Sequence, residues 1–126
     1  MPKQIHNLPS APAPVGPYSV ATEANGFVFV SGQVGIDPAV GSVVAGGVAA
    51  ETRQIMENLG SILGDLELGY ADIVKTTIFL TDMADFGTVN AIYGEFVDEA
   101  KPARSTVAVA GLPLGVNVEI EVLAAR

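Results

Sequence analysis

Residues 73–110 have the sequence IVKTTIFLTDMADFGTVNAIYGEFVDEAKPARSTVAVA, and this stretch decides the fold class. Its first part, from Ile73 to Thr81, is rich in β-branched residues and predicts a strand. From Asp82 to about Ala100, apolar residues recur at helical spacing, and the acidic residues at the start suit the first turn of a helix. A second strand is predicted from Ala103 to Ala110. The stretch therefore predicts a strand, a helix and a strand in succession.

The sequence on either side of this stretch predicts further strands and one more helix. Downstream, a turn is expected from Leu112 to Gly115 and a final strand from Val116 to Ala125. Upstream, a helix is predicted from about Val48 to Leu66, because six residues recur at helical spacing on one face: Thr52, Ile55, Leu59, Ile62, Leu63 and Leu66. The helix after Asp82 has a similar apolar stripe of five residues: Phe86, Val89, Tyr93, Phe96 and Val97.

The N-terminal part of the chain predicts a hairpin followed by a loop. Asn25-Gly26 is a strong signal for a two-residue hairpin turn. It separates a strand from about Ser19 to Glu23 from a strand at Phe27 to Val30. Residues 37–47 are rich in turn-forming residues, and an additional edge strand is expected near Lys3 to Asn7. The predicted order is two strands, a helix, a strand, a helix and two strands.

The predicted fold class is α+β, as one domain that spans residues 1–126. Two helices can cover only one face of a sheet of this size. Yet three predicted strand segments carry apolar residues on both faces: Phe27 to Val30, Ile78 to Leu80 and Val118 to Leu123. A sheet that is apolar on both faces needs cover on both. We therefore expect a second copy of the chain to cover the other face, in a homo-oligomer.

The composition is typical of a folded domain without a membrane segment. The chain has 126 residues, of which 49% are hydrophobic and 16% are charged. No apolar run approaches the roughly 18 residues of a membrane helix. The N-terminus lacks the apolar region of a signal peptide. Because cysteine is also absent, a cytoplasmic protein with no membrane partner is expected.

The charge of the chain disfavours nucleic acid as a partner. The formal net charge is −8, and binding to nucleic acid depends mainly on Lys and Arg side chains that neutralise phosphates. A small anionic ligand would need a local cation instead. The candidates are Lys3, Arg53, Lys75, Lys101, Arg104 and Arg126.

Motifs of several common site classes are absent from the sequence. It contains no HExxH, CxxC, GxxxxGK[ST] or GxGxxG pattern. The only histidine, His6, is expected to be a strand or surface residue. A single histidine disfavours both a Ser-His-Asp triad and a metal site with several histidines. We therefore expect neither a metal nor a cofactor.

The last two predicted strands carry charged residues among apolar ones. If they form an antiparallel hairpin, Thr106 lies about opposite Glu119 and Arg104 about opposite Glu121, with all four side chains on one face. One interpretation is a cross-strand salt bridge worth about 0.2–1 kcal/mol. The other is a functional site in which Arg104 grips a small carboxylate, because burying an arginine and two glutamates is costly without a function.

Short motifs along the whole chain resemble those of the RidA/YjgF family, and their order and spacing agree with it as well. The motifs are Gly16-Pro17-Tyr18-Ser19, Phe29-Val30-Ser31-Gly32-Gln33, Asp72-Ile73-Val74-Lys75-Thr76-Thr77, Thr81-Asp82, Val89-Asn90, Pro102-Ala103-Arg104-Ser105, Leu112-Pro113 and Val118-Glu119-Ile120-Glu121. The resemblance implies a chorismate-mutase-like mixed sheet with two helices on one face. It also implies a homotrimer with clefts between its subunits.

The resemblance further implies an enzymatic activity and a set of site residues. The best-known members hydrolyse reactive enamine and imine acids, such as 2-aminoacrylate and 2-iminopropionate, to the 2-keto acid and ammonia, which limits metabolite damage. In the family pattern, Arg104 matches the arginine that binds the substrate carboxylate. Glu119 matches the acid that positions the attacking water. The other positions that match the cleft are Tyr18, Ser31, Gly32, Asn90 and Thr106.

Two departures from the family pattern leave the substrate open. Thr106 stands where many members carry cysteine, and the loop before Pro102 is a few residues shorter than in the best-known deaminases. One alternative is a deaminase of another substrate, such as an aminomuconate-type acid. A second is a non-catalytic trimer that binds small carboxylates such as 2-keto acids, or that acts like a chaperone. RNA cleavage, attributed to some relatives, is disfavoured by the net charge.

Overall fold

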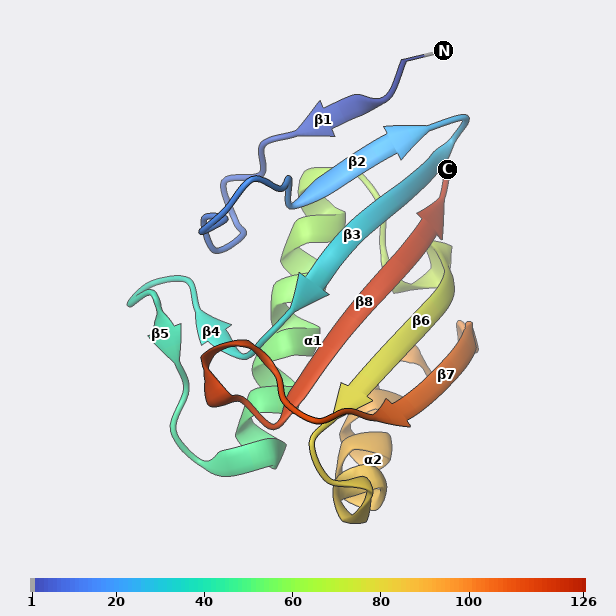
Figure 1. Ribbon diagram of the computed structural model, residues 1–126. Coiled ribbons are helices and arrows are strands. Elements are labelled where there is room, and N and C mark those ends of the chain that lie inside the picture. Colours follow the sequence, from blue (N-terminus) through green and yellow to red (C-terminus); the bar gives the residue numbers. More distant parts are fainter. Residues whose placement is uncertain (1) are drawn as a thin grey trace.

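The structure is a computed structural model that describes residues 2–126 (Figure 1). Within these residues, six strands form one sheet in the order β1-β2-β3-β8-β6-β7. They are β1 (Gln4–His6), β2 (Ala21–Ala24), β3 (Phe27–Gln33), β6 (Ile73–Leu80), β7 (Ala103–Ala108) and β8 (Val118–Ala125). The segment predicted as a loop contains a small hairpin of β4 (Ile36–Asp37) and β5 (Ser42–Val43).

Two α-helices in the described part of the chain, α1 (Gly47–Asp65) and α2 (Phe86–Val97), lie on one side of the sheet, behind it in Figure 1. All six residues of the stripe predicted for the first helix are buried. In the second stripe, Val89, Tyr93 and Val97 are buried, and the two phenylalanines pack against the core. The predicted α+β class, with two helices on one face, is confirmed.

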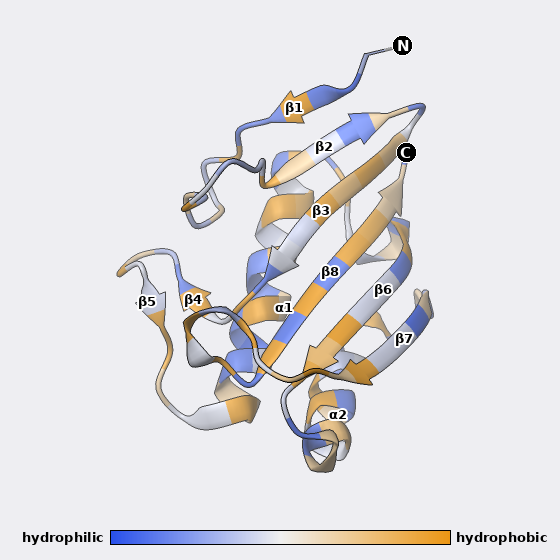
Figure 2. Cartoon of the chain, viewed as in Figure 1, coloured by the Kyte–Doolittle hydropathy of each residue, from blue (hydrophilic) through white to orange (hydrophobic). Residues whose placement is uncertain are grey.

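The opposite face of the sheet is open in the single chain. Along β3, Val28 and Val30 are buried, whereas Phe27 and Phe29 are 44% and 48% exposed. Figure 2 shows hydrophobic and hydrophilic residues alternating along β8, the strand next to β3. The expectation of apolar side chains on both faces is confirmed for β3. Along β8, the open face carries Glu119 and Glu121 as well as Leu123, and within residues 2–126 the two α-helices lie on the other side of the sheet.

The predicted hairpin between the last two strands is wrong. β7 pairs with β6 in parallel, and β8 lies between β3 and β6 as an antiparallel strand. The physical reason is the helix that connects β6 to β7. A strand, a crossover helix and a strand form a unit whose two strands run parallel. The chain then crosses the end of β6 to reach the vacant position beside it, so β8 cannot pair with β7.

The turns and strand ends follow from local sequence. Asn25 and Gly26 have φ values of 52° and 81°, the left-handed conformation that both central residues of a type I′ turn need. The Asp82 carboxylate accepts the backbone N–H of Ala84 at 2.9 Å, but residues 83–85 form a 3₁₀ turn, so α2 begins at Phe86. Among residues 2–126, no helix combines the length and hydropathy needed to cross a membrane.

Candidate active site

Arg104 lies on β7, an edge strand of the sheet, and projects toward the helices. In the parallel register Arg104 is the partner of Thr76, so the two side chains share a face. Thr76 is buried, and its hydroxyl lies 2.8 Å from the hydroxyl of Tyr93 on α2. Arg104 therefore lies on the helix side of the sheet, beside α2.

The Arg104 guanidinium is held by three side chains of α2. Its Nη1 donates to Asn90 Oδ1 at 2.6 Å, and its central carbon lies 5.4 Å from the ring centroids of both Phe86 and Tyr93. A cation–π contact at an exposed site contributes about 0.5–1 kcal/mol. None of these partners is negatively charged, and within residues 2–126 Arg104 forms no ion pair. The cation is thus fixed in place while no described residue neutralises its charge.

Sequence reasoning found Asn90 but not the part that the two aromatic rings have in holding Arg104. The helical spacing places Phe86 and Tyr93 only in the apolar stripe of the helix. They lie four residues before and three residues after Asn90, so all three share one face of α2. This spacing was the available signal.

Thr106 lies on the same face of β7 as Arg104, two residues along the strand. It is the partner of Ile78 in the parallel register. Its hydroxyl is buried and has no hydrogen-bond partner within residues 2–126. A buried hydroxyl without a partner costs about 1–3 kcal/mol.

The structure brings Arg104, Asn90 and Thr106 to the edge formed by β7 and α2. We call these three residues the Arg104 group.

Glu119 lies on β8, on the open face of the sheet, where its register partner is Phe79 of β6. The pairing of β3 with β8 shifts between Val30 and Gln33, which marks a bulge. At this bulge, Gly32 packs directly against the Glu119 carboxylate. A Cβ at residue 32 would lie 2.8 Å from the carboxyl carbon of Glu119. A larger residue at this position would therefore displace the Glu119 side chain, so Gly32 leaves room for the carboxylate in its present place.

The environment of Glu119 changes its acidity. Its pKa is raised above the ordinary value of 4.5, first by burial and second by the negative charge of Glu121. Both effects disfavour the ionised form of the carboxyl group. A raised pKa brings proton transfer closer to neutral pH, which suits a carboxylate that orients or deprotonates water.

Ser31 and Tyr18 lie on the chain segments next to Gly32. The Ser31 hydroxyl donates to the carbonyl oxygen of Ser19 at 2.6 Å, and the Ser31 N–H donates to the carbonyl of Val20 at 2.9 Å. These bonds fix the N-terminal loop beside the bulge. The Tyr18 side chain is 52% exposed. The Glu119 group, as we call it, consists of Glu119, Gly32 and Ser31, and the place of Tyr18 in the site stays a prediction.

The two groups are separated within one chain. β6 lies between β7 and β8, and the two groups are on opposite faces of the sheet. Along β6, the partners of Arg104 and Glu119 are Thr76 and Phe79, a spacing of roughly 10 Å along a strand. The prediction that Arg104, Thr106, Glu119 and Glu121 share one face is therefore wrong. A small substrate cannot contact both groups of the same chain.

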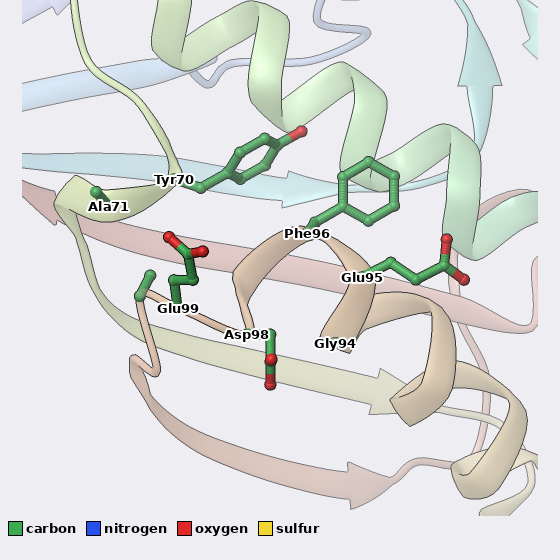
Figure 3. Close-up of a pocket in the computed structure, with 8 residues that line it drawn as sticks. Tyr70, Ala71, Gly94, Glu95, Phe96, Asp98 and Glu99 are labelled. Atoms are coloured by element: carbon green, nitrogen blue, oxygen red, sulfur yellow. The ribbon is translucent and has the colours of Figure 1, made fainter.

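The hollow at Arg104 suits an anionic ligand better than a larger hollow elsewhere. The first has a volume of about 400 Å³, and its lining includes two cations, Lys101 and Arg104, and one carboxylate, Asp98, beside Asn90 and Tyr93. Figure 3 shows the larger one, of about 450 Å³, where Glu95, Asp98 and Glu99 lie near Tyr70 and Phe96. Its acidic side chains disfavour a carboxylate, and it contains none of the predicted site residues. Within residues 2–126, no group of three or more His, Cys, Asp or Glu side chains could hold a metal ion.

Comparisons with known proteins place this geometry in a family. The sequence profile described as endoribonuclease L-PSP matches residues 8–126. A mouse protein named 2-iminobutanoate/2-iminopropanoate deaminase is 44% identical over 124 residues, which cover 98% of this chain and 92% of the mouse chain. The chloroplastic Reactive Intermediate Deaminase A of Arabidopsis thaliana is 46% identical over 122 residues, which cover 97% of this chain and 65% of the plant protein.

A solved structure agrees with the fold along the whole length. The crystal structure of Escherichia coli TdcF with bound serine has a TM-score of 0.90 and 39% identity, and the match covers 98% of both chains. The chain thus shares the fold of this structure, matches the family profile over residues 8–126 and aligns with relatives over nearly its whole length. The protein belongs to the endoribonuclease L-PSP family, which is the RidA/YjgF family that its motifs resemble.

Proposed function

We propose that this protein hydrolyses small 2-imino acids, of the 2-iminopropionate type, to the 2-keto acid and ammonium. The observation that carries the proposal is the Arg104 guanidinium, which is held by neutral side chains and forms no ion pair among residues 2–126. A planar carboxylate matches the fork of an arginine, which binds it through two parallel hydrogen bonds. The mouse and Arabidopsis relatives, both named deaminases, support the same reaction class.

The reaction needs little from the protein beyond position and one proton acceptor. Water adds to the imine carbon of the iminium form, and the C–N bond of the resulting carbinolamine then breaks. The overall change converts the iminium and water to a ketone and ammonium, so no oxidant or reductant is required. Arg104 would hold the carboxylate, while Glu119 would orient the water and take a proton from it. The raised pKa of Glu119 suits this transfer.

The separation of the two groups supports a site that is shared between subunits. Arg104 and Glu119 lie on opposite faces of the sheet in one chain, so the Arg104 group of one subunit would need the Glu119 group of another. The open apolar face with Phe27 and Phe29 supplies a surface for such contacts. We propose a homotrimer, the assembly that the family resemblance implies.

RNA cleavage is the activity that the family description suggests, and the charge of this chain disfavours it. The formal net charge is −8. RNA binding depends on cations that neutralise phosphates, and a protein this acidic repels a polyanion. The Arg104 hollow offers a site for one carboxylate rather than a basic stripe along a backbone.

Because the substrate is unstable, the test generates it during the assay. A dehydratase that makes 2-aminoacrylate from serine generates the imine continuously, and the release of pyruvate is timed with and without this protein. The proposal predicts faster release that is proportional to the added protein. Release at the spontaneous rate, from a folded protein at micromolar concentration, would rule the proposal out.

A further inference from the structure

Glu51 is a buried carboxylate with no part in the chemistry proposed above. It lies on α1 and is 5% exposed. Its Oε1 accepts the backbone N–H of Asn117 at 2.9 Å, and its Oε2 accepts the side-chain Nδ2 of Asn117 at 2.8 Å. Hydrogen bonds to a carboxylate are among the stronger ones in proteins. Glu51 therefore ties α1 firmly to the residue that precedes β8.

Asn117 is close to Glu119 along the chain and is fixed on two sides. It lies two residues before Glu119, directly before the first residue of β8. Its carbonyl oxygen also accepts the backbone N–H of Thr81 at 3.2 Å, just after β6. The start of β8 is thus joined to both α1 and β6. A shift of Asn117 would be passed along the strand to Glu119.

Glu51 also contacts the chain segment that follows Gly32. A Cβ at Gly35 would lie 2.8 Å from the Cα and 3.0 Å from the carbonyl oxygen of Glu51. The backbone at Gly35 is therefore pressed against α1 at this residue. Gly35 lies three residues after Gly32, which packs on the Glu119 carboxylate. Glu51 thus contacts the segment that leads to Glu119 and the segment that follows Gly32, and these two segments bring Gly32 and Glu119 together.

We propose that Glu51 is a positioning residue that sets the place of the Glu119 carboxylate against Gly32, by holding Asn117 on one side and Gly35 on the other. The kinetic test of this role rests on the proposed function. A displacement of about 1 Å at a catalytic group can lower a rate by about 10²-fold. Glu51 touches no substrate, and Arg104, which binds the carboxylate, lies elsewhere. Its loss should lower kcat and leave KM unchanged.

The donors and acceptors of this pair allow a test with a built-in rescue. Asn117→Asp sets a carboxylate against Oε2 of Glu51 and removes the donor. Glu51→Gln can keep both bonds, because its amide nitrogen can donate to a rotated Asn117 while its oxygen still accepts the backbone N–H. In the double variant, the glutamine amide can donate to the new aspartate. We expect kcat to fall about 10- to 100-fold in Asn117→Asp and to recover in the double variant.

Asp72→Asn is a matched control. Asp72 also accepts a backbone N–H, that of Gly69, at 2.8 Å. It lies directly before the first residue of β6, however, whereas Phe79, the partner of Glu119, is next to the last residue of that strand. It should lower the melting temperature and leave kcat unchanged. If Asn117→Asp fails to fold, Asn117→Ala replaces it, since this variant keeps the backbone bond and loses only the side-chain bond. A smaller fall in kcat at constant KM is then expected.

Crystal structures of Asn117→Asp and of the double variant separate this inference from the proposed function. In the single variant, the Glu119 carboxylate should move away from Gly32, and in the double variant it should return. An unmoved Glu119, or a wild-type kcat in both Asn117 variants, would overturn the positioning role. An inactive wild-type protein would defeat the deaminase proposal only, because the crystallographic comparison would still decide the role of Glu51.

Discussion

The Arg104 guanidinium is positioned by the side-chain amide of Asn90 and by two aromatic rings rather than by a carboxylate. Asn90, Phe86 and Tyr93 orient the guanidinium without neutralising it. A glutamate in place of Asn90 would hold the arginine more tightly and would also compete with a substrate carboxylate. The neutral partners therefore favour binding of an external anion.

Replacing Arg104 should abolish catalysis without unfolding the protein. Arg104→Ala removes one partner of a charged hydrogen-bond pair with the substrate, a loss that typically amounts to about 2–5 kcal/mol. Because the carboxylate is bound in both ground and transition states, KM should rise, and kcat should fall as well because the substrate is no longer oriented toward the water. Arg104→Lys should recover little, since an ammonium lacks the fork. The imine assay and calorimetric titration with a 2-keto acid measure both effects; wild-type activity in Arg104→Ala would contradict the assignment.

Glu119 should act in its ionised form, and its pKa sets a limit at acid pH. As the pH falls through the raised pKa, the carboxylate takes up a proton and kcat should fall, so the acid limb should lie above 4.5. Glu121→Gln removes the second cause of the shift and should move this limb to lower pH. Glu119→Gln should lower kcat by about 10²–10⁴-fold and remove the limb. A pH profile of kcat that is identical in all three proteins would assign the limb to another group.

At the scale of elements, most of the fold could be predicted because its signals are local. Helical spacing located α1 and α2, and Asn25-Gly26 located the first hairpin. The partners of β7 and β8 could not be predicted in this way, because strand order depends on which strand position is vacant once α2 has returned the chain to the sheet. The expected pairing of β7 with β8 therefore puts Arg104 on the wrong face, although its charge and the family resemblance still indicate it as a candidate site residue.

The same substitution at two glycines should have opposite effects on stability. Gly35→Ala forces a Cβ to 2.8 Å from the α1 backbone at Glu51, and such overpacking costs about 1–3 kcal/mol. Gly64 lies in the last turn of α1, and a Cβ there would meet nothing within 4 Å. Gly64→Ala should raise stability by roughly 0.5–1 kcal/mol, because alanine favours the helix. Urea unfolding measures both; equal effects would mean that the backbone at Gly35 moves freely.

For the whole molecule, the open face should be an interface between copies of the chain. Light scattering should give about three times the chain mass of 12.9 kDa. Phe29→Glu sets a charge on this face and should yield folded monomers, since burying an unpaired charge is costly. Val40→Glu is the control, because Val40 is 74% exposed in the β4–β5 hairpin. A wild-type protein that is active as a monomer would defeat the shared site.

Mixing two inactive variants tests the shared site directly. Arg104→Ala keeps Glu119, and Glu119→Gln keeps Arg104, so a mixed oligomer contains some sites with both residues intact. Random assembly of equal amounts in a ring should restore about a quarter of the wild-type sites, because each site draws one residue from each of two neighbours. Co-expression with different affinity tags provides the mixed oligomers. No recovery in purified mixed oligomers would place both residues in one subunit's site.

The placement of Arg104 and Glu119 on opposite faces of the sheet also bears on how the amount of protein controls its output. A chain with a complete site of its own would deliver a rate in proportion to copy number. Sites divided between two chains follow mass action, so the rate rises more steeply than copy number wherever the subunits dissociate. The activity would then require a threshold concentration of the protein, below which the chains are folded but dissociated and inactive.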